Sequence, residues 1–224
     1  MRVLVACEES QRVCKAFRAL GHESYSADIQ EPSGGYLEWH ILGDVLPLLN
    51  GGAFHTMDGA THNILKWDII IAHPPCTYLS FAGYKYLSVE RYGEKALERI
   101  KLREQAFDFA MACYNADCEH VCIENPKGYI NQKFRSPDCI INPYDFGESE
   151  RKRTCLWLRG LPPLMPTYQI PPPEPKFIGS DGKARYFTDS QHNKKSRSVT
   201  FEGIAAAMAW QFTHNFYIGG VFDG

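Results

Sequence analysis

Short apolar runs and amphipathic stretches alternate along much of the chain. Apolar runs within residues 2–6, 68–72 and 120–125 are typical of strands buried on both faces of a sheet. Residues 11–20 instead space their apolar side chains as one face of a helix would, and so do residues 90–116. Strands that alternate with helices predict an α/β fold with a mostly parallel sheet.

The opening segment predicts a strand–helix–strand unit. Ser10 is suited to cap the start of the helix over 11–20, and Gly21 is suited to end it. The next strand-like stretch, ESYSA, leads into an acidic residue, Asp28. Such a unit begins a doubly wound sheet.

The remaining patterns are less regular. Residues 31–65 are rich in glycine and predict irregular structure, with a short helix or turn at Gly43-Asp44-Val45. The run RTCLWL at 153–158 predicts a further strand, and residues 201–212 predict an amphipathic helix. Seven prolines within 161–177 predict an extended connector.

These patterns divide the 224 residues into one domain and a short appendage. We expect a catalytic α/β domain over residues 1–160 and a Pro-rich, basic recognition segment over 161–197. Residues 198–224 are expected to form a C-terminal helix that packs back on the first domain.

Charge is unevenly distributed although the net charge is only −2. Residues 127–197 carry 13 lysines and arginines against 7 acidic residues, a balance of +6, which leaves −8 for the rest of the chain. This asymmetry fits a protein that contacts nucleic acid on one side. A basic surface without such a partner fits the charges equally well.

The sequence was also searched for membrane-spanning segments, a signal peptide and a zinc site. No apolar run approaches the roughly 20 residues that cross a bilayer, and the N-terminal segment lacks a signal-peptide pattern. We therefore expect no membrane partner and a cytoplasmic location. Cys113, Cys118 and Cys122 are spaced too widely for a zinc knuckle, so no metal site is predicted.

Reactive or polar residues directly follow several of the apolar runs. They are CEES at 7–10, Asp28, HPPC at 73–76 and ENP at 124–126. The carboxyl ends of parallel strands form the ligand crevice of open α/β sheets. The four segments together predict the rim of an active site.

In the same order along the chain, these segments resemble motifs of the cytosine-5 DNA methyltransferases. IIIAHPPC at 69–76 resembles the family's Pro-Pro-Cys motif, and VCIENP at 121–126 resembles its Glu-Asn motif. SERKR at 149–153 is similar to Gln-x-Arg-x-Arg, and the Gly-Asp-Val step at 43–45 to the step at the cofactor's adenine. SVTFEGIAAAMA at 198–209 resembles the family's last motif.

The resemblance implies a Rossmann-like, S-adenosylmethionine-dependent fold with a minimal recognition segment, in a compact, bacteriophage-type enzyme. It implies S-adenosylmethionine as cofactor and DNA as partner, and RNA stays open as an alternative substrate. The residues implied to take part in catalysis are Cys76, Glu124, Arg151 and Arg153. Those implied to bind the cofactor are Cys7, Glu8, Glu9, Ser10, Asp28, Asp44 and Pro74.

Cytosine chemistry explains these residue types. Carbon 5 becomes nucleophilic once a thiolate adds to carbon 6, and Cys76 would supply that thiolate. Glu124 would donate a proton or hydrogen bond at ring nitrogen 3, which requires a raised pKa. Arg151 and Arg153 alternate at a strand start, so both would point to one face and steady the cytosine carbonyl or a phosphate.

A target base stacked in a duplex must be flipped out to be reached. Residues 77–92 interleave five aromatic side chains with Lys85 and Arg91, which suits a loop that closes over such a base. A packed connection between a strand and a helix is the alternative.

The chain departs from the family at the turn after the first strand. That turn, CEES, has no glycine, although an acidic residue in it could face the positive charge of S-adenosylmethionine. His73 stands where the family commonly has glycine, and it would either tune Cys76 or be structural. A different one-carbon donor, or an inactive DNA-binding relative, are the alternative interpretations.

The recognition segment is also short. Only 43 residues separate Arg153 from Arg197, too few for the recognition domain usual in the family. We expect basic side chains there to hold phosphates with little sequence preference, namely Lys176, Lys183, Arg185, Lys194 and Lys195.

Overall fold

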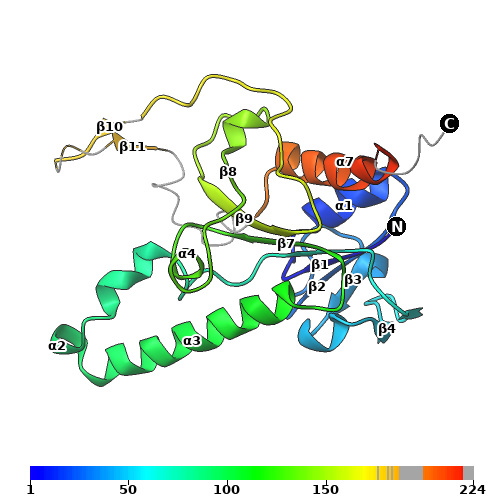
Figure 1. The fold of residues 1–224 in the computed structure, drawn as a ribbon, viewed down its shortest axis with the longest axis horizontal. Coiled ribbons are helices and arrows are strands. Elements are labelled where there is room, and N and C mark those ends of the chain that lie inside the picture. The colour runs from blue at the N-terminus through cyan, green and yellow to red at the C-terminus, as the bar shows by residue number, and fades with distance from the viewer. Residues whose placement is uncertain (176, 181, 183, 187–198, 219–224) are drawn as a thin grey trace.

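A seven-stranded sheet runs through the middle of the protein (Figure 1). The computed structural model describes residues 1–175, 177–180, 182, 184–186 and 199–218. The strands of the sheet are β1 (Arg2–Ala6), β2 (Glu23–Asp28), β3 (His40–Leu42), β6 (Ile69–Ala72), β7 (His120–Asn125), β8 (Cys139–Ile141) and β9 (Thr154–Arg159). Their order is β3-β2-β1-β6-β7-β9-β8, and only the pairs made by β9 are antiparallel.

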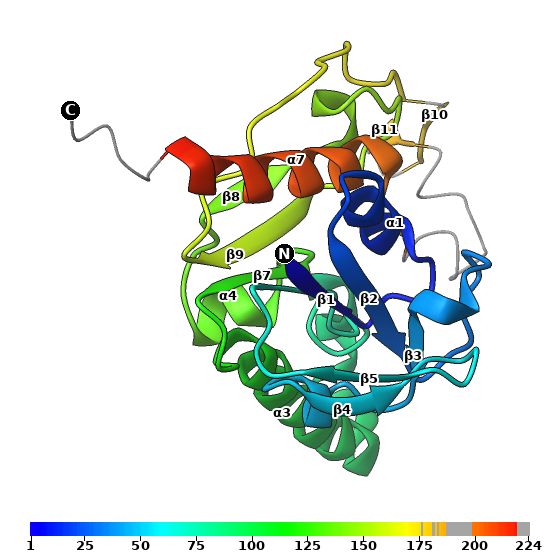
Figure 2. The same cartoon turned by 90° about the vertical axis from the view of Figure 1, so that its right-hand side faces the viewer.

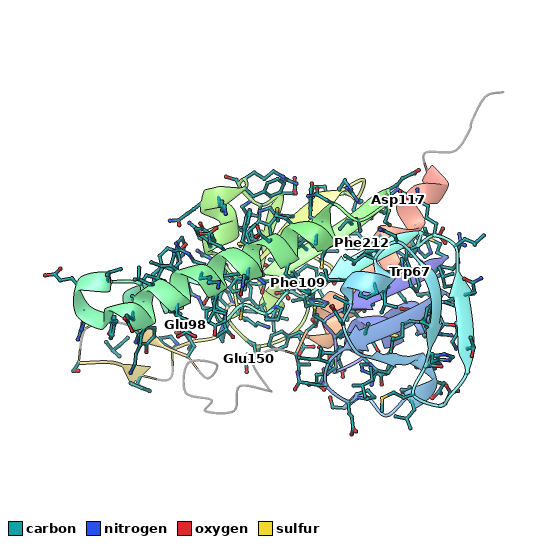
Figure 3. All side chains as sticks on the ribbon, turned by 90° about the horizontal axis from the view of Figure 1, so that it is seen from below. Trp67, Glu98, Phe109, Asp117, Glu150 and Phe212 are labelled. Atoms are coloured by element: carbon teal, nitrogen blue, oxygen red, sulfur yellow. The ribbon has the colours of Figure 1, made fainter. Side chains whose placement is uncertain are left out.

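Helices cover both faces of this sheet (Figure 2). On one face, α1 (Arg12–Ala19) lies beside α7 (Glu202–Ile218). On the other face lies the long helix α3 (Glu94–Tyr114), preceded by the short helix α2 (Val89–Tyr92). Figure 3 shows Glu98 near the α2 end of α3 and Asp117 just beyond its other end. The fold is therefore α/β and is compatible with a Rossmann-like arrangement.

Smaller elements connect these parts. The short helices are η1 (Leu37–Trp39), η2 (Leu46–Leu48), η3 (Phe81–Tyr86), α4 (Tyr129–Lys133) and η4 (Pro143–Asp145). Two antiparallel hairpins pair β4 (Gly52–His55) with β5 (Thr61–Ile64) and β10 (Phe177–Ile178) with β11 (Ala184–Arg185).

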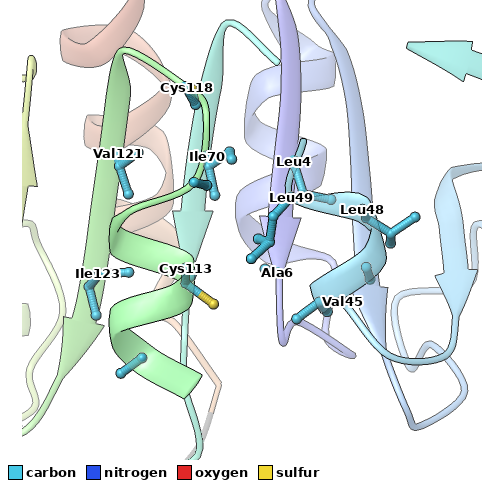
Figure 4. Close-up of a cluster of buried hydrophobic side chains, with 14 of the residues drawn as sticks. Leu4, Ala6, Val45, Leu48, Leu49, Ile70, Cys113, Cys118, Val121 and Ile123 are labelled. Atoms are coloured by element: carbon cyan, nitrogen blue, oxygen red, sulfur yellow. The ribbon is translucent and has the colours of Figure 1, made fainter. Parts of the chain in front are cut away.

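The apolar strands divide the core into two layers because successive side chains point to opposite faces of a sheet. In β1, Leu4 and Ala6 pack toward α3, whereas Val3 and Val5 pack toward α1 and α7. Figure 4 shows the α3 side of this core, with Cys113 lying against the parallel strands. All four of these β1 residues are fully buried, so the strand anchors both layers.

The long apolar strands lie where the sequence predicts them, and β7 has the predicted bounds. The helix predicted over 201–212 is α7, which continues to Ile218. The helix predicted over 90–116 is divided at Gly93, whose φ of 53° suits glycine. The prediction of irregular structure over 31–65 is wrong in part, because β3 and the hairpin β4–β5 lie there.

The start of α1 also differs from the prediction. The N-cap is Gln11, in a left-handed conformation with φ of 58°, rather than Ser10. Gly21 lies one residue beyond the C-cap, Leu20, and its φ of 80° is typical of a helix end. Among the helices in the described part of the chain, none is both long and apolar enough to cross a membrane.

Candidate functional site

Cys76 lies in a tight turn that follows β6, at the carboxyl end of the parallel strands. Its thiol-bearing side chain is exposed, whereas Pro74, two residues earlier, is buried. The carbonyl oxygen of Cys76 accepts hydrogen bonds from the backbone N–H groups of Leu79 (3.1 Å) and Ser80 (3.0 Å). We call residues 73–80 the Cys76 turn.

All eight cysteines lie in the described part of the chain, and Cys76 is the exposed one. Burial raises the pKa of Cys14 and of Cys113 to about 12, so these thiols stay protonated at neutral pH. Burial likewise raises the pKa of Cys122 well above its ordinary value. Since the thiolate is the nucleophile, exposure sets Cys76 apart from the cysteines of the core.

The end of β7 holds the Cys76 turn in place. The side-chain amide of Asn125 donates a hydrogen bond to the carbonyl oxygen of Pro74 over 2.6 Å, and both residues are buried. A β-bridge joins Ser80 to Gly128, where a Cβ atom would lie 1.9 Å from the carbonyl oxygen of Leu79. Position 128 therefore has room only for glycine.

Glu124, next to Asn125 on β7, pairs with the first residue of the same turn. Its Oε2 lies 3.0 Å from Nδ1 of His73, and the two side chains are only 14% and 9% exposed. The other ring nitrogen of His73, Nε2, is buried and has no hydrogen-bond partner among the described residues. The sequence did not predict a pairing of His73 with Glu124.

The electrostatics of Glu124 correct one expectation. Burial alone would raise the pKa of its carboxyl group, but the hydrogen bond from His73 and the positive charge of Lys152 outweigh burial. The pKa of Glu124 is therefore lowered, not raised as predicted for a residue that donates a proton at nitrogen 3. The ionised carboxylate of Glu124 is therefore stabilised by both neighbours.

The basic run before β9 presents a different residue to Glu124 than the sequence suggested. The strand begins at Thr154, so Arg151 and Arg153 precede it and are both exposed. Arg151 hydrogen-bonds to the hydroxyl of Tyr186 and stacks on its ring, 4.7 Å from the centroid.

Lys152 points the opposite way from its two neighbours. It lines a small cavity with Glu124 and Thr154, closed on its other side by the start of α7. Lys152 was not predicted as a site residue, although the alternation of side chains that puts Arg151 and Arg153 on one face puts Lys152 on the other.

The turn after β1 has positive φ angles, which usually require glycine, although it contains no glycine. Cys7 has φ of 60° and Gln11 has φ of 58°, conformations that L side chains rarely adopt. The carboxylate of Glu8 turns inward and accepts hydrogen bonds from the backbone N–H groups of Val13 (2.6 Å) and Cys14 (3.1 Å). Glu8 thereby caps α1 with its carboxylate turned into the protein, and its role in cofactor binding stays a prediction.

A neighbouring loop covers the rest of this turn. Glu9 and Ser10 are buried, and the carbonyl oxygen of Glu9 accepts a hydrogen bond from the backbone of Ser33 over 2.8 Å. A Cβ atom at Gly34 would lie 2.7 Å from the carbonyl oxygen of Ser10, so the two segments touch. Glu9 and Ser10 therefore lie beneath the loop.

Three other predicted cofactor residues lie at the carboxyl ends of neighbouring strands: Cys7 follows β1, Asp28 ends β2 and Asp44 follows β3. Burial first, and then the charges of Cys113, Asp28 and Asp44, raise the pKa of the Cys7 thiol. Asp28 accepts a hydrogen bond from the backbone of Gln30 (2.9 Å). Asp44 is exposed and accepts one from the backbone of Leu46 (3.0 Å). The two aspartates are thus close enough to Cys7 to affect its charge.

Part of the predicted recognition segment can be placed. Its residues 177–178 and 184–185 form the hairpin β10–β11. Lys176, Lys183, Lys194 and Lys195, predicted to hold phosphates, lie outside the described residues.

No protein-family model matches this sequence, and no curated protein matches it. The function is therefore inferred from the residues and their geometry.

Proposed function

We propose that this protein is a DNA (cytosine-5) methyltransferase that works through a covalent adduct between Cys76 and carbon 6 of the target cytosine. One observation carries the proposal. An exposed cysteine at the end of β6 is tied through Pro74 and Asn125 to the strand that bears Glu124. A nucleophile and an acid–base group thus come from neighbouring parallel strands, at the edge where α/β sheets bind ligands.

The residues of the site would divide the reaction as follows. The Cys76 thiolate forms a bond to carbon 6, and the ring electrons move toward carbon 5 and nitrogen 3. Glu124 takes a proton from water and passes it to nitrogen 3, and His73 and Lys152 stabilise the carboxylate that remains. After methyl transfer, carbon 5 loses its proton to water and the bond from sulfur to carbon 6 breaks, which returns the thiolate. Nitrogen 3 then gives its proton back to Glu124.

S-adenosylmethionine, when bound, supplies an electrophilic methyl group to carbon 5. Asp28 and Asp44 would hold it, because carboxylates at the ends of the first strands accept hydrogen bonds from ribose hydroxyls and the adenine amino group. The acceptor groups on these two residues fit such a ligand. Glu8 does not, since its carboxylate is committed to the backbone of α1.

The DNA would lie against the exposed basic residues at the start of β9. Arg151 and Arg153 both face solvent, which suits contact with phosphates or with the cytosine carbonyl. Because carbon 6 is unreachable in a stacked base pair, the target base must leave the duplex to meet Cys76.

The test is covalent trapping on DNA that contains 5-fluorocytosine, with S-adenosylmethionine labelled in its methyl group. Fluorine at carbon 5 cannot leave as a proton does, so the adduct persists and is seen as a protein–DNA band. We expect the band with the parent protein and its loss in Cys76→Ala. Cys139→Ala, a matched change at a half-buried cysteine on β8, should keep it.

The outcomes separate the parts of the proposal. Absence of an adduct on DNA of varied sequence would contradict the proposal. An adduct without transfer of the label would keep Cys76 as the nucleophile and reject S-adenosylmethionine as the donor.

A further inference from the structure

A second hollow opens directly beside the Cys76 turn, which contributes Tyr78 to its wall. It lies between η3, α2 and the start of α3 and has a volume of about 470 Å³. Its walls include Tyr78, Tyr86, Tyr92 and Arg99. This volume falls within the roughly 300–1,000 Å³ of small-molecule sites.

Arg99 organises the rings that line this hollow. Its guanidinium lies 5.0 Å from the ring centroid of Tyr78 and 5.2 Å from that of Tyr86. The same group donates a hydrogen bond of 3.0 Å to the carbonyl oxygen of Thr77, the residue after Cys76. The position of the tyrosine rings is therefore coupled to the backbone that carries the nucleophile.

The ring of Tyr86 is open to solvent, and those of Tyr78 and Tyr92 are partly exposed. Tyr86 is 43% exposed, and its ring centroid lies 5.8 Å from that of Tyr92 in a tilted arrangement. This argues against the simpler interpretation of residues 77–92 as a packed connection. Exposed aromatic faces held by cations are the usual platform for stacking bases of single strands.

The charge of the region suits a polyanion. Residues 77–103 contain six lysines and arginines against three glutamates, a balance of +3. Lys95 and Glu98 lie at the rim of the hollow, and Figure 3 shows Glu98 on the half of α3 nearest α2. A base could stack on the tyrosines while cations of the same segment meet its phosphates.

We propose that this hollow binds an unpaired DNA base next to the target cytosine in the same strand. The proposal rests on the proposed function for the identity of the strand, but its geometry is separate from the reacting groups. A base that is paired and stacked in a duplex presents no free face to a tyrosine. The substrate is then DNA whose strand is open for more than the target nucleotide.

The first test measures binding of a fluorescently labelled single-stranded oligodeoxynucleotide by anisotropy, without cofactor and in the Cys76→Ala background. Tyr86→Ala should weaken binding about 5- to 150-fold, the range expected for loss of one base–aromatic stack. Tyr86→Phe, which keeps the ring, should stay within about two-fold of the parent.

Trp210→Ala is the matched control, since Trp210 is a similarly exposed aromatic residue (54%) on α7, at the opposite face of the sheet. Binding that is unchanged in Tyr86→Ala, or weakened as much by Trp210→Ala, would overturn the proposal. Thermal melting checks that each variant is folded.

The second test removes single bases from the oligonucleotide on either side of the cytosine. One abasic position should weaken binding of the Cys76→Ala protein as much as Tyr86→Ala does. Combined with Tyr86→Ala, that abasic position should cause no further loss, because ring and base lose the same contact. Losses that simply multiply at every position would overturn the proposal.

These binding measurements separate this proposal from the proposed function. Trapping on 5-fluorocytosine DNA can fail while Tyr86-dependent binding persists, which would reject the reaction and keep the base site. Adduct formation with unchanged binding in Tyr86→Ala would keep the reaction and reject the base site.

Discussion

Two glutamates with little exposed surface, each at the carboxyl end of a parallel strand, have opposite electrostatic properties. Glu8 follows β1, and burial raises the pKa of its carboxyl group despite two backbone hydrogen bonds. Glu124 ends β7, and there the hydrogen bond from His73 and the charge of Lys152 outweigh burial and lower the pKa. Their positions in the sequence, near the ends of apolar strands, do not distinguish the two residues.

The difference lies in what each carboxylate contacts. Glu8 contacts neutral N–H groups at the start of α1, so its role is to position a helix. Glu124 contacts the imidazole of His73 in the Cys76 turn, so it is the glutamate that the proposed reaction uses. Burial of an acid is therefore weak evidence of catalysis until its partners are known.

The largest effect is expected from removing the cap. Glu8→Ala leaves two buried N–H groups of α1 without acceptors, which should lower the free energy of unfolding by about 2–4 kcal/mol. Urea denaturation measures the change, and Glu8→Gln, which keeps one oxygen, should lose less. Glu38→Ala, at an exposed glutamate, is the control. Full stability of Glu8→Ala, with loss of cofactor binding, would return Glu8 to the role predicted from sequence.

The next effect concerns the partner of Glu124. His73→Ala removes a hydrogen bond to a buried carboxylate and should cost about 1.5–3 kcal/mol in stability. It should also raise the pKa of Glu124, because that hydrogen bond is the largest of the influences that lower it. The pH profile of the rate of adduct formation should then move to higher pH. An unshifted profile would show that His73 is only structural.

A smaller effect separates the two glutamates by pH. The unfolded pKa of each is near 4.5. Because the pKa of Glu8 is raised in the folded state, the protein loses stability as the pH rises from about 4.5 through the pKa that Glu8 has in the folded state. The lowered pKa of Glu124 gives stability that is present above that value and lost as pH falls through the folded pKa.

The free energy of unfolding, measured over a pH series, should therefore depend less on pH in both variants. We expect the weaker dependence above about pH 4.5 in Glu8→Gln and below it in Glu124→Gln. Each unit of pKa shift corresponds to about 1.4 kcal/mol. A weaker dependence on the same side for both variants would contradict the assignment.

The smallest effect is expected on the outside of α1. Arg12 and Glu202 form an ion pair of 3.0 Å between α1 and α7, and both side chains are substantially exposed. Arg12→Ala should change stability by less than about 1 kcal/mol, because solvent screens such pairs. A loss as large as that of Glu8→Ala would mean that the surface pair, not the buried cap, holds α1.

Elements with a continuous local pattern were predictable from sequence. The strand β6 is an uninterrupted apolar run, and β7 contains one at residues 121–123. The positions of Cys76 after β6 and of Glu124 near the end of β7 could therefore be predicted. The hairpin β4–β5 was missed because its strands alternate only weakly. It is held by distant contacts, such as Phe54 stacking 5.9 Å from Trp67.

The partners of the site residues were less predictable. The inward turn of Glu8 depends on where α1 starts, which the unusual backbone of Gln11 decides. The pairing of His73 with Glu124 depends on the register that sets Ala72 beside Ile123. Neither follows from local propensity, because both arise from contacts between segments far apart in the chain.

The close approach at Gly128 has a consequence for how this protein could change over generations. The loop after β7 and the loop after β6 meet with no space for a side chain. A change in the backbone of one loop therefore has to be matched by a change in the other. In a saturation-mutagenesis selection, we expect position 128 to return glycine alone, while the exposed neighbour Lys127 accepts many residues. A lineage could redesign the surface around this junction, but not the junction itself.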